Sequence, residues 1–341
     1  MTSKLACLCD YAKGKIAVET LTAHTYISTE NMMPSKGGVV DASSLPSVSF
    51  TQQYIKGDVL VSNIRPYFKK IWQAEYDGGC SNDVLVFRAK KGCVPTFLYY
   101  VLANDVFFNY ATATSKGTKM PRGDKKAIMQ YDVPDFDLNT QNRIAKLLRS
   151  LDAQIETNGK INDNLEQQAK SLYEEMFLNN PDADMVSGTL SDIATITMGQ
   201  SPSGSSYNED SVGEVFYQGR AEFGFRFPTR RLFTTEPKRM AEPGDVLLSV
   251  RAPVGDLNVA YEKCCIGRGL GAIHSKTGDS SFMLYTMFAL KPQLDVFNGE
   301  GTVFGSINRD GLSNLPVNIP SAEEIAKFEA VVRPMDNLIR A

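Results

Sequence analysis

The sequence lacks the features that mark a membrane or exported protein. No apolar run approaches the roughly 18 residues that a membrane-spanning helix requires. The N-terminus shows no basic start followed by an apolar stretch, so nothing indicates export and we expect a cytoplasmic protein. Metal ligands are scarce, because there are only two histidines and the six cysteines contain no CxxC pair. Zinc usually needs four nitrogen or sulfur ligands at short spacings, so we predict no metal site.

Catalytic motifs are missing as well. The chain has no GxxxxGK[ST] phosphate loop. Residues 267–271 contain three glycines without the G-x-G-x-x-G spacing of a dinucleotide loop, so we interpret them as a turn. There is no Asn-Pro-Pro-aromatic tetrapeptide, with which an amino-methyltransferase holds its target base, and no Ser/His/Asp arrangement stands out. The sequence therefore offers no candidate active site.

The sequence does have the composition of a globular protein, and it contains an internal repeat. At 341 residues, with 43% hydrophobic and 22% charged residues, the chain is long enough for two folding units. Gly57–Ser62 (GDVLVS) returns 187 positions later as Gly244–Ser249 (GDVLLS). Ile144–Lys146 returns 181 positions later as Ile325–Lys327. Because such matches follow one another in the same order, they indicate an internal duplication.

Each half has the same succession of local patterns. Short β-type runs at 83–87 and 245–250 are bounded by Gly, Pro and Asn, and brief helical patches follow at 97–110 and 282–290. A mixed α+β fold suits this order better than a regular alternation of strands and helices.

A long helix is predicted between the halves. From Ile144 to Met176, apolar residues and two asparagines alternate at spacings of four and three, which is a heptad pattern. Residues 140–178 would form a helix about 58 Å long. Asn158 and Asn162 occupy core positions of this seam, where polar residues fix register and partner number at a cost in stability. A helix lying on a domain surface is the alternative.

Basic residues concentrate in two glycine-containing segments. Residues 114–126 carry five positive charges and one negative charge, and residues 220–239 carry six and two. The overall net charge of −3 excludes a uniformly basic nucleic-acid coat but not local basic patches. By contrast, residues 152–184 hold eight acidic and two basic residues, which a DNA-facing element would not show. The pattern suggests two DNA-binding units on an acidic spacer.

Specific motifs resemble a known family. Residues 249–256 (SVRAPVGD) and 265–273 (CIGRGLGAI) are similar to motifs of the DNA-specificity subunit of type I restriction–modification systems. The similarity extends over nearly the whole chain. Further matching stretches are 57–67, 115–122, 141–145 and 198–202.

The resemblance implies a fold and a division of labour. It implies two similar mixed α/β target-recognition domains, at 1–137 and 181–320, separated by a long coiled-coil helix at 138–180. Each domain would read one half of a split DNA target, and the helices would dock two methyltransferase subunits that methylate adenine. S-adenosylmethionine would be bound by those subunits, and ATP with Mg²⁺ by the motor/nuclease subunits that join for restriction. The chain itself would have no catalytic residues and no cofactor.

The C-terminus departs from the family pattern. A second long helix is expected there, but residues 321–341 repeat only the beginning of the first. The seam would then lack much of its internal partner. We expect the partner helix to come from a methyltransferase subunit or from a second copy of this chain, because an exposed apolar stripe favours association.

The resemblance also suggests the binding residues. DNA contacts are expected at Arg65, Lys69, Lys70, Lys116, Lys119, Arg122, Lys125, Lys126, Arg220, Arg226, Arg230, Arg231, Arg251, Arg268, Asn308 and Arg309. Subunit docking is expected at Leu148, Leu151, Ile155, Leu165 and Leu172. For Arg251 and Arg268, a structural role in a pair with Asp256 or Asp245 is the alternative. For the whole chain, the alternatives are an orphan or degenerate coiled-coil DNA-binding or assembly protein of this family, or a DNA enzyme with an unrecognised site.

Overall fold

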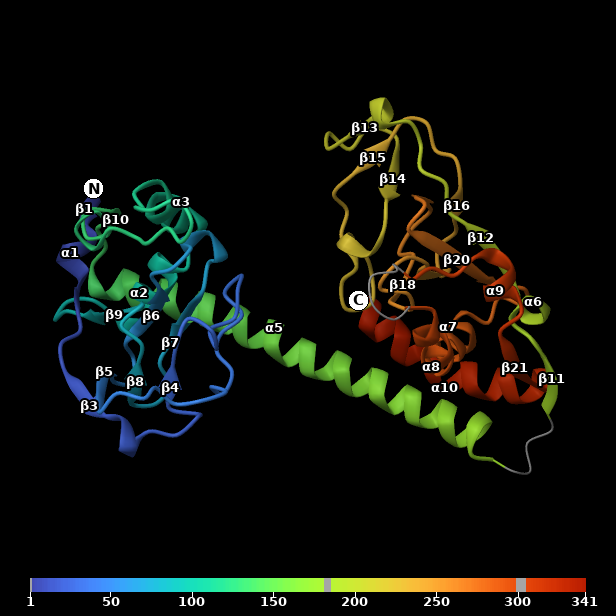
Figure 1. The fold of residues 1–341 in the computed structure, drawn as a ribbon, viewed down its shortest axis with the longest axis horizontal. Coiled ribbons are helices and arrows are strands. Elements are labelled where there is room, and N and C mark those ends of the chain that lie inside the picture. Colours follow the sequence, from blue (N-terminus) through green and yellow to red (C-terminus); the bar gives the residue numbers. More distant parts are fainter. Residues whose placement is uncertain (1, 181–184, 299–304) are drawn as a thin grey trace. The chain divides into compact units, whose positions relative to one another are not determined.

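The computed structural model describes residues 2–180, 185–298 and 305–341, which form two compact units, Met1–Glu156 and Thr157–Ala341. The long helix α5 (Leu138–Tyr173) runs from the first unit into the second along the chain and continues as a π-helical turn, Glu174–Leu178 (Figure 1). The predicted long helix and the mixed α and β content are therefore confirmed. No helix in the described part of the chain is both long and apolar enough to cross a membrane.

The first unit is built on two four-stranded sheets. One has the order β2 (Cys9–Tyr11), β9 (Val84–Ala89), β6 (Val59–Ser62), β7 (Ile71–Gln73), with all neighbours antiparallel. The other has the order β3 (Lys15–Ala17), β5 (Phe50–Tyr54), β8 (Gly78–Cys80), β4 (Tyr26–Ile27). The terminal strands pair as β1 (Thr2–Lys4) with β10 (Asp132–Pro134). The helices are α1 (Leu5–Leu8), α2 (Pro95–Leu102), α3 (Asp105–Ala113) and α4 (Lys125–Ile128).

The second unit repeats this plan. Its antiparallel sheet has the order β12 (Ala194–Met198), β20 (Leu270–Ser275), β17 (Val246–Ser249), β18 (Leu257–Val259). A second sheet has the order β13 (Tyr207–Asn208), β15 (Phe233–Thr234), β14 (Glu214–Tyr217), β19 (Cys264–Ile266), β16 (Met240–Ala241). Strands β11 (Met185–Thr189) and β21 (Pro316–Pro320) pair as β1 and β10 do. The helices are α6 (Leu190–Ile193), α7 (Ser280–Ala289), α8 (Lys291–Asp295), α9 (Arg309–Ser313) and α10 (Ala322–Arg340).

Strand register confirms the duplication residue by residue. Strand β8 runs parallel to β4 with Cys80 opposite Ile27, as β19 runs parallel to β14 with Ile266 opposite Tyr217. In the antiparallel sheets, Ser62 of β6 faces Val84 and the corresponding β17 ends with Ser249 facing Leu270. Positions in the two domains can therefore be matched directly, including those in the loops between paired strands.

The repeated Gly-Asp motif is a structural turn. Gly57 and Gly244 adopt φ values of 93° and 90°, a conformation that glycine enters without steric cost. The next residue, Asp58 or Asp245, is buried, and its carboxylate accepts a backbone N–H from three residues earlier at 2.9 or 2.8 Å. Asp58 also binds Arg88 at 2.8 and 2.6 Å, whereas Asp245 binds His274 Nδ1 at 2.6 Å. The most regular repeat in the sequence thus specifies folding rather than DNA contact.

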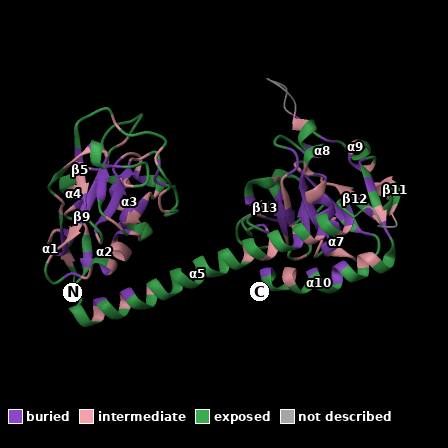
Figure 2. Cartoon of the chain, turned by 90° about the horizontal axis from the view of Figure 1, so that it is seen from below, coloured by how far each residue is buried: buried purple, intermediate pink, exposed green. Residues whose placement is uncertain are grey.

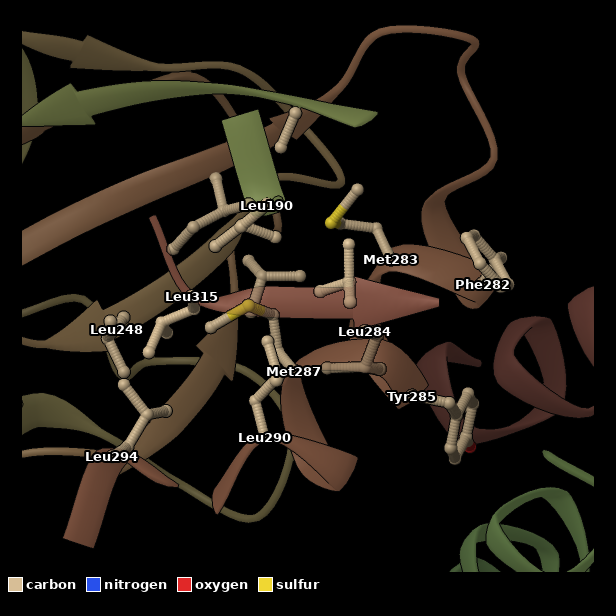
Figure 3. Close-up of a cluster of buried hydrophobic side chains, with 14 of the residues drawn as sticks. Leu190, Leu248, Phe282, Met283, Leu284, Tyr285, Met287, Leu290, Leu294 and Leu315 are labelled. Atoms are coloured by element: carbon tan, nitrogen blue, oxygen red, sulfur yellow. The ribbon is translucent and has the colours of Figure 1, made fainter. Parts of the chain in front are cut away.

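Helix α10 packs on the C-terminal part of α5. Phe328 of α10 lies 5.7 Å from the ring of Tyr173 and 5.5 Å from that of Phe177, and all three rings are buried in the core of the second unit. The same core includes the apolar side chains of α7, β17 and α6 that Figure 3 shows. Helix α10 therefore belongs to the core of its own domain.

The middle of α5 is exposed within the described part of the chain. Residues 151–160 are all exposed, and Ile155 keeps 71% of its surface accessible (Figure 2). The apolar seam is thus covered at both ends, by the core of the first unit around Ala145 and by α10 near Tyr173, whereas residues 151–160 are exposed.

We expect Phe328→Ala to lower the free energy of unfolding of the second unit by about 3–5 kcal/mol, because it opens a cavity among buried aromatic rings. Val212→Ala is the control, since Val212 is exposed in the same unit and its truncation should change stability by less than about 0.5 kcal/mol. Urea unfolding followed by circular dichroism measures both. Equal effects of the two substitutions would contradict the packing of α10 on α5.

Candidate nucleic-acid interface

Predicted DNA-binding segments from distant parts of the sequence meet just after the central strands β6 and β17. In the first domain Ile64, two residues beyond β6, forms a bridge with Arg122. In the second domain Arg251, two residues beyond β17, forms the equivalent bridge with Ser306. Soon after each bridge a short helix begins, capped by Asp124 in one domain and by Asn308 in the other. The basic segment 114–126 and the Arg251–Asn308 region therefore occupy corresponding places in the two domains.

The second domain has a hollow at this place. It has a volume of about 700 Å³, and Arg251, Arg268 and Asn308 line it together with small residues such as Gly199 and Ser306. Both arginines are exposed, and neither forms an ion pair within the described residues. Arg251 and Arg268 therefore do not pair with Asp256 or Asp245, which was the structural alternative. Asp256 binds Arg220 and Asp245 binds His274. Two guanidinium groups that have no carboxylate partner among the residues the structure describes make the hollow attractive to an anion.

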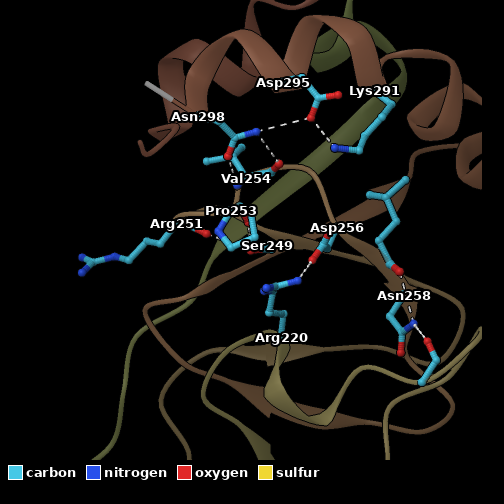
Figure 4. Close-up of polar contacts among 12 residues, drawn as sticks. Arg220, Ser249, Arg251, Pro253, Val254, Asp256, Asn258, Lys291, Asp295 and Asn298 are labelled. Atoms are coloured by element: carbon cyan, nitrogen blue, oxygen red, sulfur yellow. Dashed lines mark hydrogen bonds and ion pairs between the residues drawn. The ribbon is translucent and has the colours of Figure 1, made fainter. Parts of the chain in front are cut away.

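The backbone around the hollow is tightly held. Ser249 Oγ lies 3.0 Å from the carbonyl oxygen of Arg251 and 2.7 Å from that of Pro253, so the turn folds over the end of β17 (Figure 4). The side chain of Arg251 extends away from this turn. On the other wall, a Cβ at Gly267 would come within 2.9 Å of the backbone of Gln218. The glycines beside Arg268 thus allow a close crossing of backbones that fixes where Arg268 is presented.

The basic segment 220–231 is largely neutralised by the protein itself. Arg220 pairs with Asp256, and Arg230 donates through Nε and Nη2 to the two carboxylate oxygens of Glu262. Arg231 pairs with Glu222. These three side chains remain about half exposed, so DNA could reach them only in competition with a carboxylate.

Arg226 corrects the sequence prediction. Its side chain is 4% exposed and forms ion pairs with Glu166 and Asp336. A buried guanidinium with two carboxylate partners cannot contact DNA, so the predicted DNA contact at Arg226 is wrong.

In the first domain, some of the predicted DNA-binding side chains are already bound by other groups of the protein. Lys69 pairs with Asp105 at 3.0 Å, and Lys70 donates to the carbonyl of Thr29 at 2.7 Å. Arg65 adopts φ 49° and places its guanidinium 5.9 Å from the ring centre of Phe68.

In the basic segment 114–126, some of the cations are likewise paired with carboxylates and others are not. Lys116 pairs with Asp124 at 2.5 Å and Arg122 with Asp83 at 3.0 Å. Three exposed cations of this segment form no ion pair among the described residues, namely Lys119, Lys125 and Lys126. In the second domain the same holds for Arg309 beside the hollow, in addition to Arg251 and Arg268.

Comparison with known proteins gives the family. The model of the type I restriction modification DNA specificity domain matches the chain twice, over residues 10–167 and 183–339. The chain belongs to the family of type I restriction–modification DNA-specificity subunits. Subunits of this family recognise DNA and have no catalytic activity of their own, and two recognition domains in one chain fit a bipartite target. The family and fold predicted from the sequence are confirmed.

Individual relatives agree. The putative type I restriction enzyme MjaX specificity subunit of Methanocaldococcus jannaschii is 30% identical over 312 residues, covering 84% of this chain and 73% of the relative. The Escherichia coli type I restriction enzyme EcoDI specificity subunit is 26% identical over 130 residues, covering 38% and 29% of the two chains. The crystal structure of the S subunit from M. genitalium matches with a TM-score of 0.64 at 15% identity, covering 99% of this chain and 90% of that one, which supports the fold.

One exposed residue of the specificity subunit escaped the sequence analysis. Three residues connect β8 to β9 and three connect β19 to β20, and their central positions are Asn82 and Arg268. Asn82 is therefore the counterpart of Arg268 in the first domain. The offset of 186 between them falls within the range of the repeat, but a lone asparagine carries no charge signal that would single it out.

The predicted docking residues differ in how far they are exposed, depending on their position along α5. Leu151 and Ile155 are exposed, whereas Leu148, Leu165 and Leu172 are half-buried. The helix is fixed to the first domain by a hydrogen bond of 2.6 Å between Tyr100 Oη and Asp152 and by an ion pair of 3.7 Å between Arg149 and Glu75. The exposed seam residues thus lie on a helix whose position within the first domain is set by polar contacts.

We expect the carboxyl group of Asp124 to titrate at low pH. Its pair with Lys116, followed by the backbone N–H groups of Ala127 and Lys126, lowers the pKa of Asp124 to about 2. A pKa lowered on folding means that the cap stabilises the fold above the ordinary pKa of aspartate and is lost as the pH falls toward 2. NMR titration should show this pKa in the wild type and a higher one in Lys116→Ala, with Lys119→Ala as the control. An unchanged pKa in Lys116→Ala would contradict the pair.

Proposed function

We propose that DNA binds the specificity subunit at the corresponding faces beyond β6 and β17, one half of a split target at each domain. The observation that carries this proposal is the hollow of the second domain, where Arg251 and Arg268 have no carboxylate partner in the described chain. Arg309 adds a further unpaired charge beside it. Unneutralised cations supply the salt-dependent attraction to phosphate that dominates DNA affinity.

In the first domain, the same face carries the exposed cations of segment 114–126 and Arg65. Lys119, Lys125 and Lys126 are free to meet phosphates, while Arg122 and Lys116 hold the segment in place through Asp83 and Asp124. Since half or more of protein–DNA hydrogen bonds go to phosphate and sugar, most of these residues position the duplex rather than specify its sequence.

The chemistry belongs to other subunits in this proposal. As a specificity subunit of a type I complex, the chain has DNA and the methyltransferase and restriction subunits as partners. We propose in addition that two methyltransferase subunits dock on the helices and methylate adenine. They would bind S-adenosylmethionine, and the motor/nuclease subunits would bind ATP with Mg²⁺. Among the described residues of this chain, no group of three or more His, Cys, Asp or Glu side chains could hold a metal ion.

The uncovered seam of α5 supports a docking role. Leu147, Leu151, Ile155 and Ile161 keep between 46% and 71% of their surface exposed. Apolar residues repeated along one face of a helix favour a partner helix. A methyltransferase subunit fits this role, and self-association with a second copy of the chain is the other candidate for the same surface.

We expect Arg268→Ala and Arg251→Ala each to weaken binding of target DNA by about 1–3 kcal/mol, with a smaller salt dependence where the lost contact was to phosphate. Arg230→Ala is the matched control, because Arg230 is similarly exposed in the same domain but already binds Glu262, so its loss should be smaller. Fluorescence anisotropy at several salt concentrations, with the methyltransferase partner present, measures the affinities. The target sequence is obtained first by methylome sequencing of a host that expresses the complex. A larger loss in Arg230→Ala than in both other variants would move the interface to segment 220–231.

We expect Ile155→Glu to abolish stable assembly with the methyltransferase subunit, because it places a charge in the centre of the exposed seam. Ser150→Glu adds the same charge on the other side of the helix and serves as the control. Light scattering of the wild type alone and with the methyltransferase subunit separates the two candidate partners. Assembly of Ile155→Glu at wild-type strength would remove the seam from the docking surface.

A further inference from the structure

Arg226 lies at the centre of a buried polar cluster in the second domain. Its Nη1 is 2.6 Å from Asp336 Oδ1 on α10, and its Nη2 is 3.2 Å from Glu166 Oε2 on α5. Nη2 also donates to Tyr285 Oη on α7 at 3.3 Å. One side chain from a surface segment is therefore bound by three different helices.

The cluster is strongly coupled. Arg226 is 4% exposed and its two carboxylate partners are 14% and 18% exposed, so all three charges have lost most of their water. Removing the arginine would leave Glu166 with Lys170 and Asp336 with the hydroxyl of Tyr285 as their remaining partners. Losing the central cation of a buried cluster is far more unfavourable than losing an exposed pair.

Arg226 also belongs to a segment that is otherwise anchored through its backbone. Its carbonyl accepts the N–H of Val259 on β18 at 2.8 Å, and the carbonyl of Gly224 accepts Asn258 Nδ2 at 2.9 Å. The segment carries the exposed arginines Arg220, Arg230 and Arg231. Thus the side chain of Arg226 ties the helices to the same stretch of backbone that presents these three arginines.

The first domain holds the corresponding segment through different contacts. The corresponding segment there lies between β4 and β5. It is held by Asn31, whose side chain bonds to the backbone of Ser28, Tyr26 and Val40, and by an ion pair of Lys36 with Asp105 at 2.8 Å. None of these groups belongs to α5. The first domain therefore provides an internal control for any effect of Arg226.

We propose that Arg226 is a positioning residue for DNA selectivity: by binding α5, α7 and α10 it fixes segment 220–231, and it does so without touching DNA. This inference rests on the proposed function, in which each domain reads its own half of the target. It makes the selectivity of the second domain depend on a charge cluster supplied largely by the helices. The inference also gives segment 220–231 a role in DNA selectivity in addition to that of the hollow, although the arginines of the segment have carboxylate partners.

The test uses Arg226→Met, which keeps an unbranched apolar stem and removes the charge, and Arg226→Lys, which keeps the charge. Arg333→Met is the matched control, since it removes an ion pair with Glu329 on α10 and leaves segment 220–231 untouched. Each variant is assembled with the methyltransferase partner, and its affinity is measured for the target and for targets with single base-pair substitutions in either half. The half read by the second domain is the one whose substitution penalties change in Arg268→Ala.

We expect Arg226→Met to reduce the penalty for a wrong base pair from about tenfold toward none in the half read by the second domain, while the other half keeps its penalties. Arg226→Lys should recover part of the loss, and Arg333→Met should behave as wild type. If Arg226→Met does not fold, as judged by thermal unfolding, Asp336→Asn is measured in the same way, because it weakens the cluster and keeps the arginine.

Two results would overturn the inference. A folded variant with wild-type penalties in both halves would make Arg226 a stabilising residue only, and an equal loss in both halves would show a general effect on the protein. Both leave the proposed function intact, because the wild type still prefers its target. A wild-type complex with no target preference would instead overturn the proposed function and the positioning role with it.

Discussion

The presence or absence of a carboxylate beside each arginine organises the second domain. A guanidinium paired inside the protein stabilises the fold, and an unpaired one at the surface attracts an anion. Arg226 is buried and paired, so it stabilises the fold and does not contact DNA. Arg220, Arg230 and Arg231 have carboxylate partners but remain exposed. Arg251 and Arg268 are left to face the hollow. The sign and location of the local field thus follow from pairing, although the whole chain is slightly acidic.

Much of the architecture was readable in the sequence because it depends on local patterns. The Gly-Asp repeats marked equivalent turns, and the heptad spacing marked α5. Charge pairing was not readable, because the partners are far apart along the chain: Asp336 is 110 residues from Arg226, and Glu262 is 32 residues from Arg230. A count of positive charges therefore overrated segment 220–239. It also missed Asn82, whose position becomes meaningful only through strand register.

The seam of α5 shows the same limit. Its periodicity predicted an apolar face along the whole helix, but pattern alone does not say which part a neighbour in the same chain will cover. Phe328 and the adjoining turns of α10 cover the end near Tyr173 and Phe177. Helix α10 contributes Phe328 and Val332 to the core of its domain, and residues 151–160 of α5 stay exposed within the described chain.

The ten exposed residues 151–160 receive little stabilisation from packing, unlike the two ends of this helix. A helical stretch of that length that buries none of its residues gains little from packing, and Gly159 within it disfavours helix further. Its order in the free subunit is propagated from the anchored turns on either side, so its amide hydrogens should exchange with solvent faster than those of the turns that pack against Phe328. A protein that covers this stretch would therefore also suppress its fraying, and part of the binding free energy would be spent on making the connection between the two recognition domains stiff.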